Sequence, residues 1–143
     1  GADDSTRLVD GIADYLSSAG HHVTRFGKAA GENEEWGDTG RRVAQAVAAG
    51  EHELGVVCCY TGTGVSIAAN KVPGVRAALC IDAETARGAR KWNDANVLAL
   101  SLRLCSEQVA SEIVAAFLSE PYAGTEHQSL GVLAALDGAR RGS

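Results

Sequence analysis

The sequence has little of what marks membrane, nucleic-acid-binding or disordered proteins. It contains only two prolines, and no apolar run approaches the roughly 18–20 residues of a membrane span. No signal peptide is visible and no basic cluster stands out, so neither a membrane nor a nucleic-acid partner is expected. With 45% hydrophobic and 22% charged residues, the 143-residue chain is typical of one globular domain covering residues 1–143.

Metal-ligand patterns are lacking as well. The cysteines show no C-x-x-C spacing, and the histidines form no ligand pattern, so we expect neither a metal nor a cofactor. Because the cysteines fall in or beside predicted strands, reduced thiols in a cytoplasmic protein are favoured over disulfides. The cysteines are Cys58, Cys59, Cys80 and Cys105, and the histidines are His21, His22, His52 and His127.

The most informative stretch runs from residue 54 to residue 71. It begins as a short apolar run that ends at Cys59, breaks at Thr61-Gly62-Thr63-Gly64, and continues as a helix-compatible segment over 65–70. A strand, a glycine-rich turn and a helix start direct backbone N–H groups and a helix dipole at an anion. Cys59 lies at the carboxyl end of the predicted strand, where open α/β sheets bind ligands. Two glycines can also simply make a tight turn.

Strands and helices alternate along the rest of the chain, which predicts a parallel sheet covered on both faces. The first helix is expected to have Asp4 or Ser5 as its N-cap and to end at Gly20. Further helices are expected at 39–49, 65–70, 83–91, 106–118 and 128–138, strands at 22–26, 56–59, 75–81 and 96–100, and loops at 27–38, 92–94 and 122–126.

A doubly wound sheet normally begins with a strand, whereas this sequence begins at the loop where that strand would end. We expect residues preceding Gly1 to supply this inner strand, because its loss would leave neighbouring backbone groups unpaired. The complete sheet would then have about five strands.

Several motifs together resemble the type B ribose-5-phosphate isomerases and their galactose-6-phosphate isomerase relatives. They are Cys59, residues 61–64, residues 66–78 and Asn93-Asp94-Ala95-Asn96-Val97. The resemblance implies a Rossmann-like three-layer α/β/α sandwich that forms a homodimer or homotetramer with shared active sites and no metal. It also implies the interconversion of an aldose and a ketose through an enediolate.

The resemblance assigns roles by position. Cys59 is similar to the thiolate that moves the proton between two sugar carbons, and the N–H groups of Gly62, Thr63 and Gly64 would hold the enediolate oxygen. Thr61 and Asn93 would contact the sugar, and Asp3 would bind a hydroxyl. Asp3 and Asp4 together could bind a diol, Tyr60 and Trp92 would line the pocket, and Arg103 matches a phosphate-side arginine.

Other positions depart from the family pattern. Asp4 replaces a histidine of the first loop, Trp92 replaces the histidine credited with ring opening, and Tyr60 places a ring beside the thiol. Glu126 and Leu130 replace two phosphate-binding arginines, and hydrogen bonds to a charged group contribute roughly 1.5–3 kcal/mol each. The sequence therefore favours a non-standard and unphosphorylated substrate, with aromatic rings at 36, 60 and 92 facing a less charged ligand.

Each assignment has a plainer structural alternative. Cys59 could be a buried small hydrophobe, Asp3 a helix N-cap, and Asn93 a turn residue. Tyr60 and Trp92 could pack at a dimer interface, and Arg103 could form an ion pair between subunits. An epimerase, or a non-catalytic partner subunit or ligand-binding protein, are the alternative functions.

Overall fold

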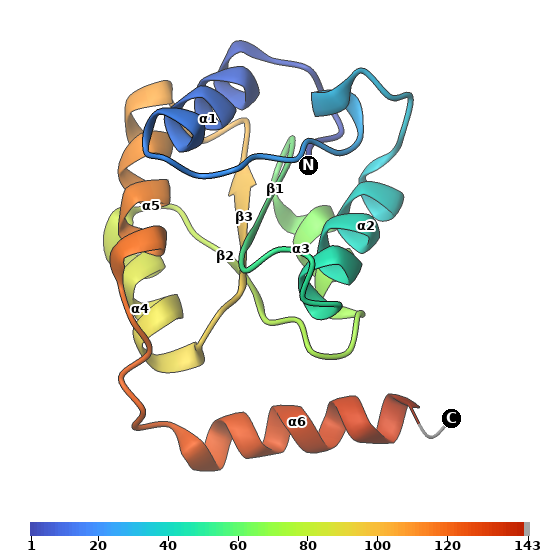
Figure 1. The fold of residues 1–143 in the computed structure, drawn as a ribbon, viewed down its shortest axis with the longest axis vertical. Coiled ribbons are helices and arrows are strands. Elements are labelled where there is room, and N and C mark those ends of the chain that lie inside the picture. Colours follow the sequence, from blue (N-terminus) through green and yellow to red (C-terminus); the bar gives the residue numbers. More distant parts are fainter. Residues whose placement is uncertain (142–143) are drawn as a thin grey trace.

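A parallel sheet lies at the centre of the molecule, as Figure 1 shows for a computed structural model that describes residues 1–141. Its three strands are β1 (Gly55–Cys59), β2 (Ala77–Leu79) and β3 (Val97–Ser101), arranged in the order β1-β3-β2. In the register, Gly55 lies beside Val97 and Cys59 beside Ser101, so the three strands begin at one edge and end at the other. These two edges are called the amino edge and the carboxyl edge below.

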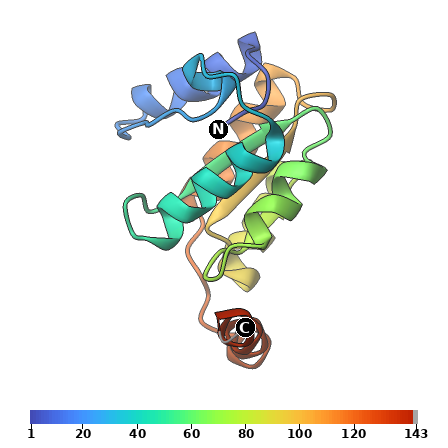
Figure 2. The same cartoon turned by 90° about the vertical axis from the view of Figure 1, so that its right-hand side faces the viewer.

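Helices cover both faces of the sheet, which makes the expected three-layer sandwich. On one side lie α4 (Ala83–Asn93) and α5 (Glu107–Ser119), with α1 (Arg7–Ser18) packed against α5; α2 (Trp36–Ala48) and α3 (Thr63–Asn70) cover the other side (Figures 1 and 2). Because side chains alternate along a strand, Cys58 joins the core under α1, α4 and α5, whereas Cys59 joins the core under α2 and α3.

Side-chain caps explain where several helices begin. The Oγ1 of Thr6, and not a side chain of Asp4 or Ser5 as expected, accepts a hydrogen bond from the N–H of Val9 at the start of α1. Asp82 and Ser106 cap α4 and α5 in the same way. Two predicted loops were wrong: α2 already begins at Trp36, and residues 92 and 93 form the last turn of α4.

The described residues contain three strands rather than about five. The predicted strand 22–26 is not formed, because no neighbouring strand pairs with its backbone in this structure. Only the first residues of the chain reach it: Ala2 makes isolated parallel bridges to Gly27 and to Cys58. The α-amino group of Gly1 donates to the carbonyl of Val56 at 2.7 Å, and burial lowers its pKa to about 6.

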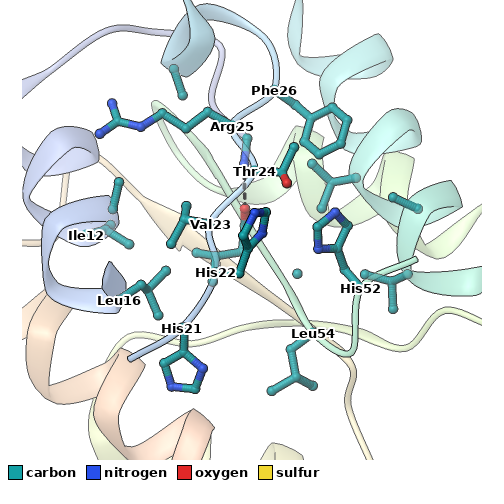
Figure 3. A pocket seen from close by; sticks show the side chains of 18 of the residues that line it. Ile12, Leu16, His21, His22, Val23, Thr24, Arg25, Phe26, His52 and Leu54 are labelled. Carbon is teal, nitrogen blue, oxygen red and sulfur yellow. Dashed lines mark hydrogen bonds between the residues drawn. The ribbon is translucent and has the colours of Figure 1, made fainter. Parts of the chain in front are cut away.

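A cavity of about 370 Å³ lies next to Gly1, between β1 and the segment 21–26 (Figure 3). Apolar side chains from α1 and from the start of β1, among them Ile12, Leu16 and Leu54, point into it. The additional inner strand stays a prediction.

Two further helical segments complete the described chain. A 3-10 turn, η1 (Lys28–Ala30), follows the segment beside Ala2, and α6 (His127–Arg141) lies apart from the layers at the amino edge (Figure 1). There Asp137 accepts a hydrogen bond from the N–H of Gly74 at 2.8 Å. Among the helices of residues 1–141, none has the length and apolar character needed to cross a membrane.

Candidate functional site

Cys59 is the last residue of β1 and stands at the carboxyl edge of the sheet. Its residue surface is only 4% exposed, and it packs with Val65 of α3 on the face covered by α2 and α3. The N–H of Leu102 donates to the carbonyl of Cys59 at 3.0 Å, so the pairing of β1 with β3 continues through this residue. The thiol is therefore placed beneath the segment that connects β1 to α3.

Gly62 shapes that connection. Its φ of 77° lies in the left-handed region, and a Cβ built on it would meet the backbone carbonyl group of Leu100 at 2.9–3.0 Å. On either side of it, the hydroxyl groups of Thr61 and Thr63 share a hydrogen bond of 2.7 Å. No side chain caps α3, so its first N–H groups are available to a ligand at the carboxyl edge.

The neighbouring β3 end holds this turn in place. The carbonyl of Tyr60 accepts hydrogen bonds from the Ser101 hydroxyl at 3.1 Å and from the Arg103 N–H at 2.9 Å. Tyr60 is 67% exposed and Arg103 is also exposed, so both residues are accessible at this edge.

Carboxylates line the opposite side of the same edge. The N–H of Asp3 donates to the carbonyl of Cys58 at 3.3 Å, which places Asp3 next to the end of β1. Burial raises the pKa of Asp3, Lys28 opposes this shift, and Asp4 and Glu35 add to it. The carboxylates of Asp3, Asp4 and Glu35 therefore make this rim acidic. Asp3 lies outside α1, so it is not a helix N-cap.

Trp36 forms a wall beside the glycine turn. A Cβ added to Gly64 would lie 2.9 Å from two atoms of the Trp36 indole, so the ring rests against the first turn of α3. The residue is 46% exposed, which leaves part of the ring open to a ligand.

The other thiols are poorly suited to chemistry. Burial raises the pKa of Cys58 to about 12 and that of Cys80 to about 11, and it also raises the pKa of Cys105. All four cysteines are free, as expected. Residues 1–141 hold no group of three or more His, Cys, Asp or Glu side chains that could bind a metal ion.

Trp92 and Asn93 do not join the other predicted site residues within one chain. They end α4 at the amino edge, whereas Cys59 ends β1 at the carboxyl edge. The four residue steps of β1 alone separate the two edges by about 13 Å. Both residues are exposed, and the Trp92 ring rests against Gly88 of its own helix.

Sequence reasoning missed three residues that shape the carboxyl edge. Lys28 and Glu35 act electrostatically on Asp3, and the buried Ser101 fixes Tyr60 and accepts the N–H of Leu104 at 3.2 Å. The contacts with Asp3 and with Tyr60 join distant parts of the chain, so no local sequence pattern predicts them.

Comparisons with known proteins identify the family of this chain. Residues 1–130 match the model of the Ribose/Galactose Isomerase family. The chain belongs to this family. This isomerase-family chain is 41% identical over 118 residues to the D-erythrulose-4-phosphate isomerase of Pectobacterium atrosepticum, covering 82% of this chain and 78% of that protein. It is 39% identical over 117 residues to the ribose-5-phosphate isomerase B of Escherichia coli, and this match also covers 82% of this chain and 78% of that protein.

The family also accounts for the fold. The ribose-5-phosphate isomerase B structure from Clostridium thermocellum superposes with a TM-score of 0.86 at 41% identity, and the match covers 93% of this isomerase-family chain and 90% of that one. The expected family and the Rossmann-like α/β/α architecture are confirmed. The two named relatives differ in the sugar phosphate that their names give.

Proposed function

We propose that this chain interconverts an aldose and a ketose, with Cys59 carrying the proton between adjacent carbons. The observation that supports this most is the placement of a thiol at the end of β1, directly before a glycine turn and an uncapped helix start. The relatives are named as isomerases of sugar phosphates, which supports the same reaction class.

The proposed chemistry follows from these groups. As a thiolate, Cys59 takes the proton from the carbon next to the carbonyl, and the bonding electrons move onto the carbonyl oxygen to give an enediolate. The N–H groups of residues 62–64 and the dipole of α3 stabilise that oxygen as its negative charge develops. The hydroxyl proton of the enediolate then moves to this charged oxygen, the other oxygen becomes the new carbonyl, and the thiol returns its proton to the neighbouring carbon to give the isomer. The paired hydroxyls of Thr61 and Thr63 hydrogen-bond the sugar.

The acidic rim favours a substrate that presents hydroxyls, not phosphate, to Asp3 and Asp4. Paired carboxylates accept hydrogen bonds from a diol but repel a phosphate, and Glu35 adds to this repulsion. Arg103 and Lys28, at the same edge, are cations available to an anionic group on the substrate's far end. A sugar other than ribose 5-phosphate is the proposed substrate.

A second copy of the chain completes the proposed site. Trp92 and Asn93 lie too far from Cys59 to share a ligand within one protomer, so they would reach it only from a partner. Exposed apolar side chains on α6, at the same amino edge, offer surface for that contact: Val132, Leu133 and Leu136. This arrangement is a homodimer in which each site draws on both protomers.

The decisive experiment is proton NMR in deuterated buffer with a panel of aldoses and ketoses, each with and without a terminal phosphate. We expect the wild type to form the isomer and to introduce deuterium next to the carbonyl. Cys59→Ala should lower the rate at least about a hundredfold, which is the usual contribution of a proton-transferring side chain. Cys58→Ala is the matched control: this neighbouring thiol faces the other side of the sheet, and its removal should leave the rate nearly unchanged.

The other outcomes are equally informative. Deuterium uptake without ketose formation would indicate an epimerase. Unchanged turnover in Cys59→Ala would exclude Cys59 as the proton carrier. No reaction with any sugar would contradict the isomerase proposal and favour a non-catalytic subunit.

A further inference from the structure

The indole of Trp36 occupies space next to the atoms that would hold the reacting oxygen. Its six-membered ring includes the atoms that approach within 2.9 Å of a Cβ position on Gly64, and Gly64 contributes one of the N–H groups proposed to bind the enediolate. An oxygen bound to that N–H would sit about 2.9 Å from its nitrogen. Substrate atoms next to this oxygen therefore lie within reach of the ring.

The packing of α2 against α3 sets where the ring lies. Trp36 is the first residue of α2, and α2 packs along α3, where Gly40 brings the two helices so close that a Cβ would meet the Val65 carbonyl at 3.0 Å. The absence of a side chain at Gly64 is what lets the indole come so near. The contact between the Trp36 ring and Gly64 is thus a joint feature of both helices.

Around the rest of the turn the space is bounded by other groups. Tyr60 stands on one side with its exposed ring, and the carboxylates of Asp3 and Glu35 stand on the side of β1. Lengthening a substrate by one carbon adds a hydroxymethylene group that must pass one of these boundaries. Of these boundaries, the Trp36 ring is the one that lies against Gly64, beside the proposed position of the reacting oxygen.

We propose that Trp36 is a specificity-determining residue that restricts the site to short sugars, with four-carbon chains preferred over five- and six-carbon chains. The inference rests on the proposed isomerase function and names the size of its substrate. It holds for sugars with or without a terminal phosphate, since it concerns room beside the reacting oxygen and not charge. The printed name of one relative, a D-erythrulose-4-phosphate isomerase, is consistent with a four-carbon substrate.

The test compares Trp36→Phe, Trp36→Leu and Trp36→Ala with the wild type on sugars of three lengths. The probes are D-erythrose, D-ribose and D-allose, each as the free sugar and as its terminal phosphate, followed by NMR in deuterated buffer. One carbon group at a steric limit changes kcat/KM by about tenfold or more, so the wild type should prefer the four-carbon sugar over the six-carbon sugar by at least about tenfold. Trp36→Ala should reduce that preference about tenfold, mainly by lowering KM for the longer sugars, and Trp36→Phe should give an intermediate ratio.

Ile67→Ala is the matched control, because Ile67 is an exposed apolar residue on α3 that lies outside the site. It should leave the chain-length ratio unchanged. Thermal melting of each variant separates lost folding from changed preference. An equal fall in kcat/KM for all three lengths in Trp36→Ala, or a wild type that favours the six-carbon sugar, would overturn this inference while leaving the isomerase proposal intact. Absence of deuterium uptake and of isomer formation with every probe would overturn both.

Discussion

The two edges of the sheet carry different parts of the predicted site and are built differently. The carboxyl edge gathers a thiol, a left-handed glycine turn, an uncapped helix start and an acidic rim, with Asp3 beside the end of β1 and Gly62 against the end of β3. At the amino edge, the Asn96 side chain hydrogen-bonds backbone groups of Gly74 and Arg76. Trp92 and Asn93, which were predicted as site residues, are exposed there. One edge leaves N–H groups available for a ligand, whereas the other uses them for structure.

Because of this difference, a single protomer cannot bring all the predicted site residues to one ligand. Strand direction places the end of β1 and the end of α4 at opposite edges, because helices between parallel strands run back across the sheet. If the family's residue pattern describes one site, that site must form between two copies.

Mixing two inactive variants would test this division most strongly. Cys59→Ala damages only the carboxyl edge, and Asn93→Ala damages only the amino edge, so we expect each homodimer to lose most of its activity. In a dimer containing one copy of each, one of the two shared sites is intact. An equal mixture of refolded or co-expressed chains should therefore recover about a quarter of wild-type activity, measured as isomer formation.

Mixing Cys59→Ala with Thr61→Ala provides the control. Both changes lie at the carboxyl edge, so each mixed dimer still has two damaged sites and activity should not return. Recovery in this control, or its absence in the first mixture, would show that the two edges do not form a shared site.

Replacing the glycine of the catalytic turn should cost the most stability. Gly62→Ala places a side chain in the left-handed region and against the Leu100 backbone, so we expect a loss of about 2–5 kcal/mol in the free energy of unfolding. Gly31 has the same φ of 77° with nothing within 4 Å, so Gly31→Ala should lose only about 1 kcal/mol. Urea denaturation measures both, and equal losses would show that close packing at Gly62 is unimportant.

Removing a side chain that fixes the amino edge should cost less. Asn96 accepts the N–H of Arg76 at 2.8 Å and donates to the carbonyl of Gly74 at 3.0 Å. We expect Asn96→Ala to lower the free energy of unfolding by about 1–3 kcal/mol, because both backbone groups lose a partner. Asn33→Ala, at an exposed loop position, should change it by less than about 0.5 kcal/mol in the same urea experiment.

The sequence was sufficient to predict the α/β layers and the carboxyl edge. The apolar run ending at Cys59 and the glycine turn after it are local patterns, and local patterns set strands and turns directly. The segment 22–26 was predicted as a strand on its alternation, but a strand also needs a paired neighbour, which only Ala2 reaches here. Trp92 and Asn93 were predicted as part of a loop, yet they form the last turn of α4, which ends at Asp94 in the left-handed region.

The missing parts of the site arise from contacts that no local pattern contains. The approach of Trp36 to Gly64 depends on how α2 packs against α3, and the approach of Glu35 to Asp3 depends on where α2 begins. The residues were visible in the sequence, but their neighbours were not.

The smallest expected effect concerns the acidic rim and its dependence on pH. Because the pKa of Asp3 is raised in the folded chain, the folded state holds this proton longer than the unfolded state does, and stability falls as pH rises through the two pKa values. Asp3→Asn removes that loss, so this variant should melt slightly above the wild type at neutral pH, and the difference should vanish below the ordinary carboxyl pKa.

Asp82 should show the opposite pH dependence. Hydrogen bonds from Thr85 lower the pKa of Asp82, so its contribution to stability is present at neutral pH and is lost on acidification. Melting curves of Asp3→Asn and Asp82→Ala across pH 3–8 should therefore diverge from the wild type in opposite directions as pH rises. If Asp3→Asn instead melts below the wild type at neutral pH, the charged Asp3 carboxylate stabilises the folded state. In that case a role in ligand binding would not be needed to explain a destabilising carboxylate at this edge.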